Sequence, residues 1–201
     1  LVGYEKWGEN VLDRLIGMFA FALWDCHKKT LVLARDRFGE KPLYYGWING
    51  SFVFGSELKA LRSFPKFNNP INRDALALYF QHSAIPAPYS IYSGIKKIMP
   101  GEIISMPLDS MKIKEEFYWN LDEVVKTSIS DKFTGSFDYA VETLDNVLSN
   151  AVKKQMISDV SIGAFLSGGL DSSLIVAMNA KLKKEAVKTF TVGFGHETDE
   201  F

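Results

Sequence analysis

The sequence lacks the features that mark secreted, disulfide-bonded or membrane proteins. Its 201 residues include a single cysteine, so no disulfide can form within the chain. No apolar run approaches the roughly 18 residues that a membrane-spanning helix requires. The first residues, LVGYEKWGEN, show no signal-peptide pattern. We therefore expect a cytoplasmic protein without a membrane partner.

An excess of charge of one sign is also missing. The chain has 23 Lys and Arg residues against 24 Asp and Glu residues, a formal net charge of -1. Because nucleic-acid-binding domains usually carry a basic excess, we expect no nucleic-acid partner. The hydrophobic fraction of 47% and the charged fraction of 23% are typical of a globular protein. The length allows one or two domains, and no internal repeat is visible.

Residues 18–119 are expected to form mostly antiparallel β-structure. MFAFALWD and TLVLARD are separated by the four residues CHKK, and PLYYGW and SFVFGS by ING, where Asn49-Gly50 favours a tight turn. These two pairs predict hairpins, and GEIISMPLD with IKEEFYW predicts a third pair of strands. SELKALRSF and NRDALALYFQHS predict helices, the second capped by Asn72. Such strands, rich in aromatic residues, indicate an α+β fold with sheet packed on sheet.

The pattern changes after residues 120–137, which lack strong apolar periodicity and are interpreted as a linker. DYAVETLDNVLSNAVKKQM then predicts a helix capped by Ser136, with one apolar face. That face contains Val141, Leu144, Leu148, Ala151 and Val152. VSIGAFL, LDSSLIVAMNAKLKKE and VKTFTVGF predict a strand, a helix and a second strand. We expect this βαβ unit to be parallel and right-handed, with both faces covered.

The loop in FLSGGLDSSLIV lies where the first of these strands meets the helix. A helix that follows such a loop presents free main-chain N–H groups and the positive end of its dipole, a common setting for phosphate. Gly168 and Gly169 can adopt positive φ and allow an anion to approach the main chain. Ser167, Ser172 and Ser173 can add hydroxyl donors. The loop is therefore predicted to bind an oxyanion.

Asp171 refines this prediction. The loop lacks the lysine of G-x-x-x-x-G-K-[ST] and does not fit G-x-G-x-x-G, so neither common nucleotide motif applies. A carboxylate beside a polyphosphate would be repelled unless a divalent cation bridged the two. The sequence therefore predicts a nucleotide whose pyrophosphate end is bound with Mg²⁺, and Asp171 is the candidate metal ligand.

S-G-G-x-D-S-S after an apolar strand resembles the PP-loop of ATP pyrophosphatases, which adenylate an oxygen of their substrate and release pyrophosphate. Upstream, GMFAFALWD, ARDRFGEKPLYY, FGSELKAL, IKKIMPGE and SDVSIGAFLSGGLDSS resemble, in this order, the glutamine-hydrolysing asparagine synthetases and their close amidotransferase relatives. The resemblance covers nearly the whole chain. It implies that glutamine yields ammonia in one domain. ATP and aspartate would form β-aspartyl-AMP in the other, and ammonia would then convert this adenylate to asparagine, with release of AMP.

The resemblance also implies a fold class and domain boundaries. We expect α+β followed by α/β, that is, a partial N-terminal-nucleophile-hydrolase sandwich and then the start of a PP-loop parallel α/β domain. Residues 1–119 would be the C-terminal part of a glutaminase-like amidotransferase domain, 120–137 the linker, and 138–201 the N-terminal part of the ATP-binding synthetase domain. The family's nucleophile is an N-terminal cysteine, whereas this chain begins with Leu1. No catalytic residue is therefore carried over, and we expect an internal fragment that is inactive alone.

The predicted ATP site joins the loop to the two strand ends. The residues expected around the pyrophosphate are Ser167, Gly168, Gly169, Asp171 and Ser172. The resemblance implies that the main chains of Leu166 and Val192 contact adenine, since adjacent parallel strands end at one crevice. ATP and Mg²⁺ are the expected cofactors, with aspartate and glutamine as small-molecule partners, and a homodimer is allowed. Two alternatives are a related amidotransferase that acts on another carboxylate and a non-catalytic binding module.

Other residues with reactive side chains are expected to play no part in chemistry. Cys26 and His27 are predicted to lie in a hairpin loop, with Cys26 a surface thiol rather than a nucleophile. His82 and His196 have no metal-ligand spacing, so no transition-metal site is expected.

ARDRFGEKP places five charged residues within the seven positions from Arg35 to Lys41. We interpret this cluster as a structural turn whose charges pair with each other and with the main chain, the alternative being an anion site. Asp199 and Glu200 are expected to lie in a solvated loop.

Overall fold

The computed structural model describes residues 1–183 and 186–193. The chain divides into two compact units, Leu1–Asp131 and Lys132–Phe201. Among the described residues, no helix is long and apolar enough to cross a membrane.

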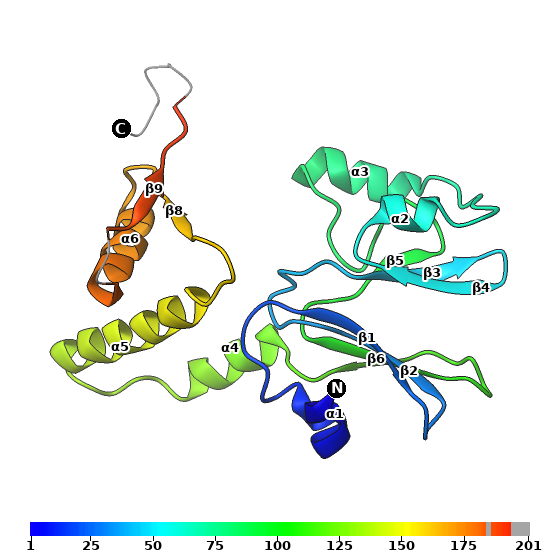
Figure 1. Ribbon diagram of the computed structural model, residues 1–201, viewed down its shortest axis with the longest axis horizontal. Coiled ribbons are helices and arrows are strands. Elements are labelled where there is room, and N and C mark those ends of the chain that lie inside the picture. Colours follow the sequence, from blue (N-terminus) through cyan, green and yellow to red (C-terminus); the bar gives the residue numbers. More distant parts are fainter. Residues whose placement is uncertain (184–185, 194–201) are drawn as a thin grey trace. The chain divides into compact units, whose positions relative to one another are not determined.

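The first unit contains a four-stranded antiparallel sheet (Figure 1). Its strands are, in spatial order, β1 (Ala20–Asp25), β2 (Thr30–Arg35), β6 (Glu102–Pro107) and β7 (Lys114–Phe117). Asp25 pairs with Thr30 at the end of β1 and β2, which leaves CHKK as the loop of the predicted hairpin. β6 and β7 pair in the same antiparallel manner. Both predicted strand pairs are thus confirmed.

A second, three-stranded antiparallel sheet lies beside the first (Figure 1). Its strands are, in spatial order, β4 (Ser51–Gly55), β3 (Tyr44–Ile48) and β5 (Ile95–Lys97). Asn49 and Gly50 join β3 to β4 with φ angles of 47° and 79°. Because φ is positive at both central residues, the turn matches the twist of the strands, and the predicted hairpin is confirmed.

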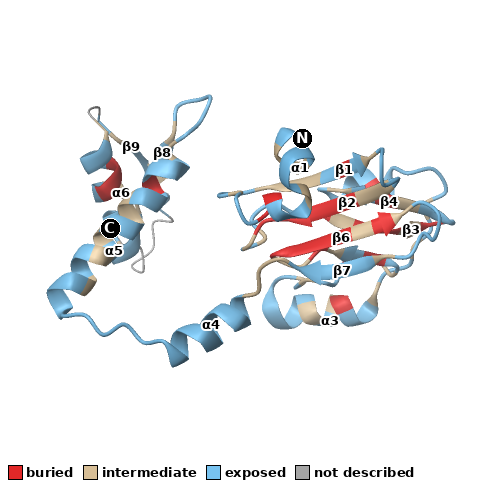
Figure 2. Ribbon diagram, turned by 90° about the horizontal axis from the view of Figure 1, so that it is seen from below, coloured by how far each residue is buried: buried red, intermediate tan, exposed pale blue. Residues whose placement is uncertain are grey.

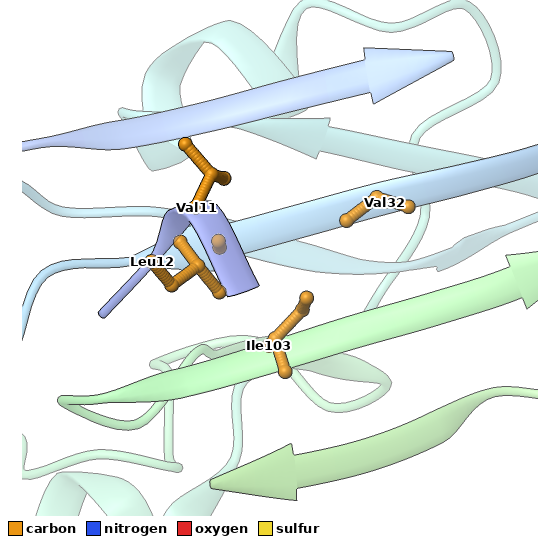
Figure 3. Packing of buried hydrophobic residues seen from close by; sticks show 5 residues of the cluster. Val11, Leu12, Val32 and Ile103 are labelled. Atoms are coloured by element: carbon orange, nitrogen blue, oxygen red, sulfur yellow. The ribbon is translucent and has the colours of Figure 1, made fainter. Parts of the chain in front are cut away.

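The core of the first unit lies between the two sheets and on the outer face of each. A cluster between the sheets contains Leu33, Leu43, Tyr45, Ile98 and Ile104. The outer face of the four-stranded sheet packs against helix α1 (Val2–Trp7) and the 3₁₀-helix η1 (Gly8–Val11), where Figure 3 shows Val11, Leu12, Val32 and Ile103 in one cluster. Neighbouring residues of β2 and β6 alternate between these clusters, as the pleat of a strand requires. The fold is therefore mixed α/β, with sheet packed on sheet.

Two helices follow β4. Leu61 of α2 (Leu58–Arg62) packs with Ile48, Val53 and Ile95 on the outer face of the three-stranded sheet. α3 (Arg73–His82) begins at Asn72, whose side-chain oxygen accepts main-chain N–H bonds from the next turn at 3.1 and 3.2 Å. The cap predicted at Asn72 is thus confirmed.

Part of the segment interpreted as a linker forms α4 (Leu121–Ser130). Asn120 caps it and accepts the N–H of Asp122 at 2.8 Å and that of Glu123 at 3.3 Å. Every residue of α4 is exposed, as the pale-blue ribbon in Figure 2 shows. The helix is therefore held by its cap and by interactions within itself, which include the Lys126–Glu123 ion pair. Its apolar periodicity is weak, so the sequence pattern did not predict it.

The second unit contains α5 (Phe137–Gln155), β8 (Gly163–Phe165), α6 (Leu170–Leu182) and β9 (Lys188–Phe190). β8 and β9 pair in parallel, so the predicted parallel βαβ unit is confirmed. Ser136 caps α5 as predicted, accepting the N–H of Tyr139 at 3.3 Å.

The expectation that both faces of this sheet are covered is wrong for the described residues. Phe165 and Phe190 are 77% and 57% exposed. The apolar face predicted for α5 is also covered only in part, because Val152 is buried whereas Leu144 is 57% exposed. The physical reason is that the described part of this unit supplies only two helices, which pack against each other and leave much of the strand surface open.

Candidate functional site

The loop between β8 and α6 holds most of the predicted site. Leu166 extends the pairing of the strands, because its N–H donates to the carbonyl of Phe190 at 2.9 Å. Gly168 adopts a φ of 87°, a conformation that side chains disfavour, which explains a glycine at this position. Gly169 is the N-cap of α6, and no side chain caps the helix there.

Two serine hydroxyls hold the loop in shape. The Oγ atoms of Ser167 and Ser172 lie 3.1 Å apart, and Ser172 Oγ also accepts the N–H of Ser167 at 3.2 Å. The hydroxyl of Ser172 donates to the carbonyl of Gly169 at 3.1 Å. The two side chains therefore bond across the loop, in addition to any contact with a ligand.

The main chain of the loop presents unused donors. Among the described residues no acceptor is found for the N–H groups of Gly168, Leu170, Asp171 and Ser172. Three of these groups belong to the first turn of α6, where the helix dipole is positive. Convergent donors at a positive helix end are suited to bind a phosphate group.

Asp171 is the second residue of α6, and it is exposed. The 1–183 and 186–193 ranges contain no group of three acidic, His or Cys side chains that could hold a metal ion by itself. One carboxylate beside main-chain donors that are suited to phosphate nevertheless fits Mg²⁺, which commonly takes one or two carboxylates, phosphate oxygens and water. Asp171 is thus the side chain in this loop that could hold the ion.

The ends of the two paired strands β8 and β9 lie side by side. Leu166 follows β8, and Val192, which is 63% exposed, follows β9 by two residues. Thr191 connects the ends, because its hydroxyl donates to the carbonyl of Leu166 at 2.6 Å. Sequence reasoning assigned no role to Thr191. The available signal was a hydroxyl side chain directly before Val192.

A hollow of about 500 Å³ opens beside the loop, between α5, β8 and α6. Asp171, Ser172 and Asn179 contribute to its lining, which otherwise consists mainly of apolar side chains such as Leu148 and Ile175. Because phosphates need charge-matched donors rather than apolar walls, the loop main chain is the better phosphate site.

In the first unit, the charged cluster from Arg35 to Lys41 is structural. Arg35 is buried and donates to the carbonyls of Ile98 at 2.6 Å, Lys41 at 2.8 Å and Gly39. Burial lowers the pKa of Arg35. Since these bonds engage all three guanidinium nitrogens, little remains for an anion.

The two residues after Arg35 also bond to the main chain. The Asp36 carboxylate accepts the N–H groups of Phe38, Glu40 and Lys41. Arg37 donates to the carbonyls of Leu12, Asp13 and Leu15. The predicted pairing with the main chain is confirmed. The expected pairing of the charges with each other is wrong, because none of the ion pairs in the described part of the chain joins two members of this cluster.

Cys26 is an exposed thiol in the β1–β2 loop, as predicted. The carboxylate of Asp25 accepts the N–H of His27 at 3.0 Å and that of Lys28 at 2.9 Å, and these bonds, Lys28 first, lower the pKa of Asp25. His82 ends α3. The predictions for His196, Asp199 and Glu200 lie outside the described residues.

Comparison with known proteins assigns the first unit. The family described as glutamine amidotransferase domain matches residues 1–119. The chain belongs to the glutamine amidotransferase family. Residues 143–201 of the chain match a second family, described as asparagine synthase, and these residues include the β8–α6 loop.

Curated relatives match along almost all of the chain. A Methanocaldococcus jannaschii protein named as a glutamine-hydrolysing asparagine synthetase is 38% identical over 98% of this chain and 38% of its own length. Glutamine-hydrolysing asparagine synthetase 3 of Bacillus subtilis is 37% identical over 100% of this chain and 32% of its own. Amidase chyE of Penicillium rubens is 32% identical over 92% of this chain and 26% of its own. The chain thus spans well under half the length of these relatives.

Proposed function

We propose that the chain is part of a glutamine-dependent asparagine synthetase, a ligase that forms asparagine from aspartate, glutamine and ATP. The observation that carries the proposal is the order of the two matched families in one chain, with the β8–α6 loop and its unused main-chain donors inside the second. The loop's unused N–H groups and its carboxylate are the chemistry that an ATP-dependent step requires.

The proposed reaction has two stages. A β-carboxylate oxygen of aspartate attacks the α-phosphorus of ATP, and the bond between that phosphorus and the oxygen bridging to the β-phosphate breaks, so pyrophosphate leaves. Glutamine hydrolysis supplies ammonia, which attacks the β-carbonyl carbon and loses a proton, while AMP leaves with the electron pair of the acyl–oxygen bond. Asparagine, AMP, pyrophosphate and glutamate are the products.

The five residues predicted around the pyrophosphate would each have a role in the first stage. The main chain of Gly168 and of the first turn of α6 would bind the pyrophosphate portion, and Gly169 starts that turn. Ser167 and Ser172 hold the loop. Asp171 would hold Mg²⁺, and the ion when bound supplies positive charge to the phosphate oxygens.

The finer architecture belongs to the same proposal. Residues 1–119 would be the C-terminal part of an N-terminal-nucleophile-hydrolase sandwich, which the two packed antiparallel sheets support. Residues 138–201 would begin a PP-loop domain, supported by the parallel pairing of β8 and β9, and 120–137 would link the two.

The test is exchange of labelled pyrophosphate into ATP by the longer protein that carries this segment. We expect exchange that requires aspartate, that is lowered at least 100-fold by Asp171→Ala, and that is unchanged by Asp159→Ala, which removes an exposed acid outside the loop. A folded wild-type protein that exchanges no pyrophosphate with any carboxylate would contradict the proposal.

A second candidate is an amidotransferase that activates a different carboxylate. It is favoured by the similarity to amidase chyE, whose name does not specify asparagine synthesis. The same assay separates the candidates, because exchange would then need a carboxylic acid other than aspartate.

A further inference from the structure

Thr191 makes a contact that the predicted site did not include. β9 ends at Phe190, yet the next residue continues the connection to β8 through its side chain, with Thr191 Oγ1 2.6 Å from the carbonyl oxygen of Leu166. The N–H of Leu166 is bonded to the carbonyl of Phe190. Both main-chain polar groups of Leu166 are therefore engaged by the neighbouring segment.

The main-chain N–H and carbonyl groups of Val192 differ from those of Leu166 in their hydrogen bonding. Among residues 1–183 and 186–193, no hydrogen-bond partner is found for its N–H or its carbonyl. Val192 comes directly after the residue that is tied to Leu166, so its position at the end of β9 depends on that tie.

Adenine and guanine present opposite patterns to such a main chain. The six-membered ring of adenine carries a donor amine beside an acceptor nitrogen, whereas guanine carries an acceptor oxygen beside a donor N–H. A carbonyl and an N–H from one extended residue match the adenine pattern and conflict with that of guanine. An unengaged main chain at a strand end is therefore suited to select adenine, provided that it is held still.

We propose that Thr191 is a positioning residue for nucleotide selection. Its hydroxyl bond to Leu166 fixes the ends of β8 and β9 together, so that the main chain of Val192 reads the base while that of Leu166 maintains the frame. This inference rests on the proposed function, since it concerns the same ATP site. It departs from the expectation that the main chains of both Leu166 and Val192 contact adenine.

The experiment uses three variants of the longer protein. Thr191→Val removes the hydroxyl and keeps the branched shape, Thr191→Ser keeps a hydroxyl, and Thr189→Val makes the same exchange at an exposed position within β9. The readouts are equilibrium binding of ATP and GTP, each with Mg²⁺, and the KM and kcat of pyrophosphate exchange.

For Thr191→Val we expect the KM for ATP to rise about fivefold, the factor that corresponds to the loss of one ordinary hydrogen bond. The kcat should change less than twofold, and the preference for ATP over GTP in binding should fall by about the same fivefold factor. Thr191→Ser and Thr189→Val should resemble the wild type. If Thr191→Val lowers the stability of the protein, the ratio of ATP affinity to GTP affinity in the folded fraction still tests the positioning role.

The outcomes separate this inference from the function on which it rests. Exchange by the wild type together with an unaltered nucleotide preference in Thr191→Val overturns the positioning role alone. A loss in Thr191→Val that Thr191→Ser does not restore also overturns it, because the hydroxyl would then be irrelevant. No exchange by the wild type with any carboxylate overturns both.

Discussion

Glu102, the first residue of β6, is a carboxylate buried to 5% exposure in the first unit. It accepts the N–H of Met99 at 2.7 Å, in the turn that leads into β6. Burial raises the pKa of Glu102, the nearby charge of Glu115 acts in the same direction, and the bond from Met99 opposes both. The protonated form is therefore favoured more in the folded protein than in the unfolded chain.

This shift predicts a pH dependence of stability. A raised pKa in the folded state means that the contribution of Glu102 is fully present below the unfolded pKa, about 4.3, and is lost as pH rises through the folded value. Glu102→Gln keeps an acceptor for Met99 but cannot ionise. We expect the free energy of unfolding of this variant, relative to wild type, to increase from pH 4 to pH 7.

Urea unfolding at several pH values measures this difference. Glu5→Gln, which changes an exposed carboxylate of α1, is the matched control and should track the wild type. A difference between Glu102→Gln and wild type that stays constant with pH would show that the carboxyl group titrates alike in both states.

At the scale of elements, the turn after β2 is stabilised from three directions. Arg35 donates across the turn to the carbonyl of Lys41. It also donates to the carbonyl of Ile98, which lies 63 positions further along the chain. Asp36 accepts N–H groups within the turn, and Arg37 reaches the carbonyl of Leu15 at 2.6 Å. The turn thus joins β2 to the segments before β1 and before β6.

Arg35→Lys is expected to destabilise the first unit by about 2–3 kcal/mol. Lysine keeps the charge, but its single ammonium group cannot reach three carbonyls in a fork, which leaves buried acceptors unpaired. The measurement is the free energy of unfolding in urea, with Arg62→Lys, an exposed position of α2, as the control. Equal stability of the two variants would contradict the structural role of the turn.

Elements with local signals could be predicted from the sequence, and those that depend on distant partners could not. Asn49-Gly50 sets its own hairpin, and Asn72 and Ser136 cap helices a few residues away. A cap also marks α4 at Asn120, but an exposed helix shows little apolar periodicity, so the pattern of this segment favours a linker.

Contacts between residues that are distant in the sequence could not be predicted. The hydroxyl of Tyr45 donates to Glu115 at 2.6 Å over 70 positions, and no pattern along the chain pairs these two residues. In the candidate site, the residues of the loop could be named because they are contiguous. The bond from Thr191 to Leu166 depends on how two strand ends meet, which the sequence does not display.

At the scale of the whole molecule, the two units differ in how much apolar surface they bury. The first contains three clusters of buried side chains. In the described part of the second, Phe137, Ile157 and Leu170 are each more than 80% exposed. Apolar surface of this extent on one unit favours association.

We expect the 201-residue chain on its own to self-associate at micromolar concentration. Leu144→Lys with Val147→Lys, both on the exposed side of α5, should reduce association because charge replaces apolar surface. Asn146→Lys with Asn150→Lys adds the same charge to exposed polar positions and should have less effect. Sedimentation velocity measures the association. A wild-type chain that sediments as a monodisperse monomer, and that shows a sharp transition in a thermal melt, would contradict the expectation.

The division into two units also determines what an optical probe can report. The sequence has four tryptophans, and Trp7, Trp24, Trp47 and Trp119 all lie in the unit Leu1–Asp131. Intrinsic tryptophan emission therefore follows the unfolding of the first unit and is silent about the second. A tryptophan introduced beside the β8–α6 loop would give each unit its own signal, so that nucleotide binding and sheet unfolding could be observed separately in one sample.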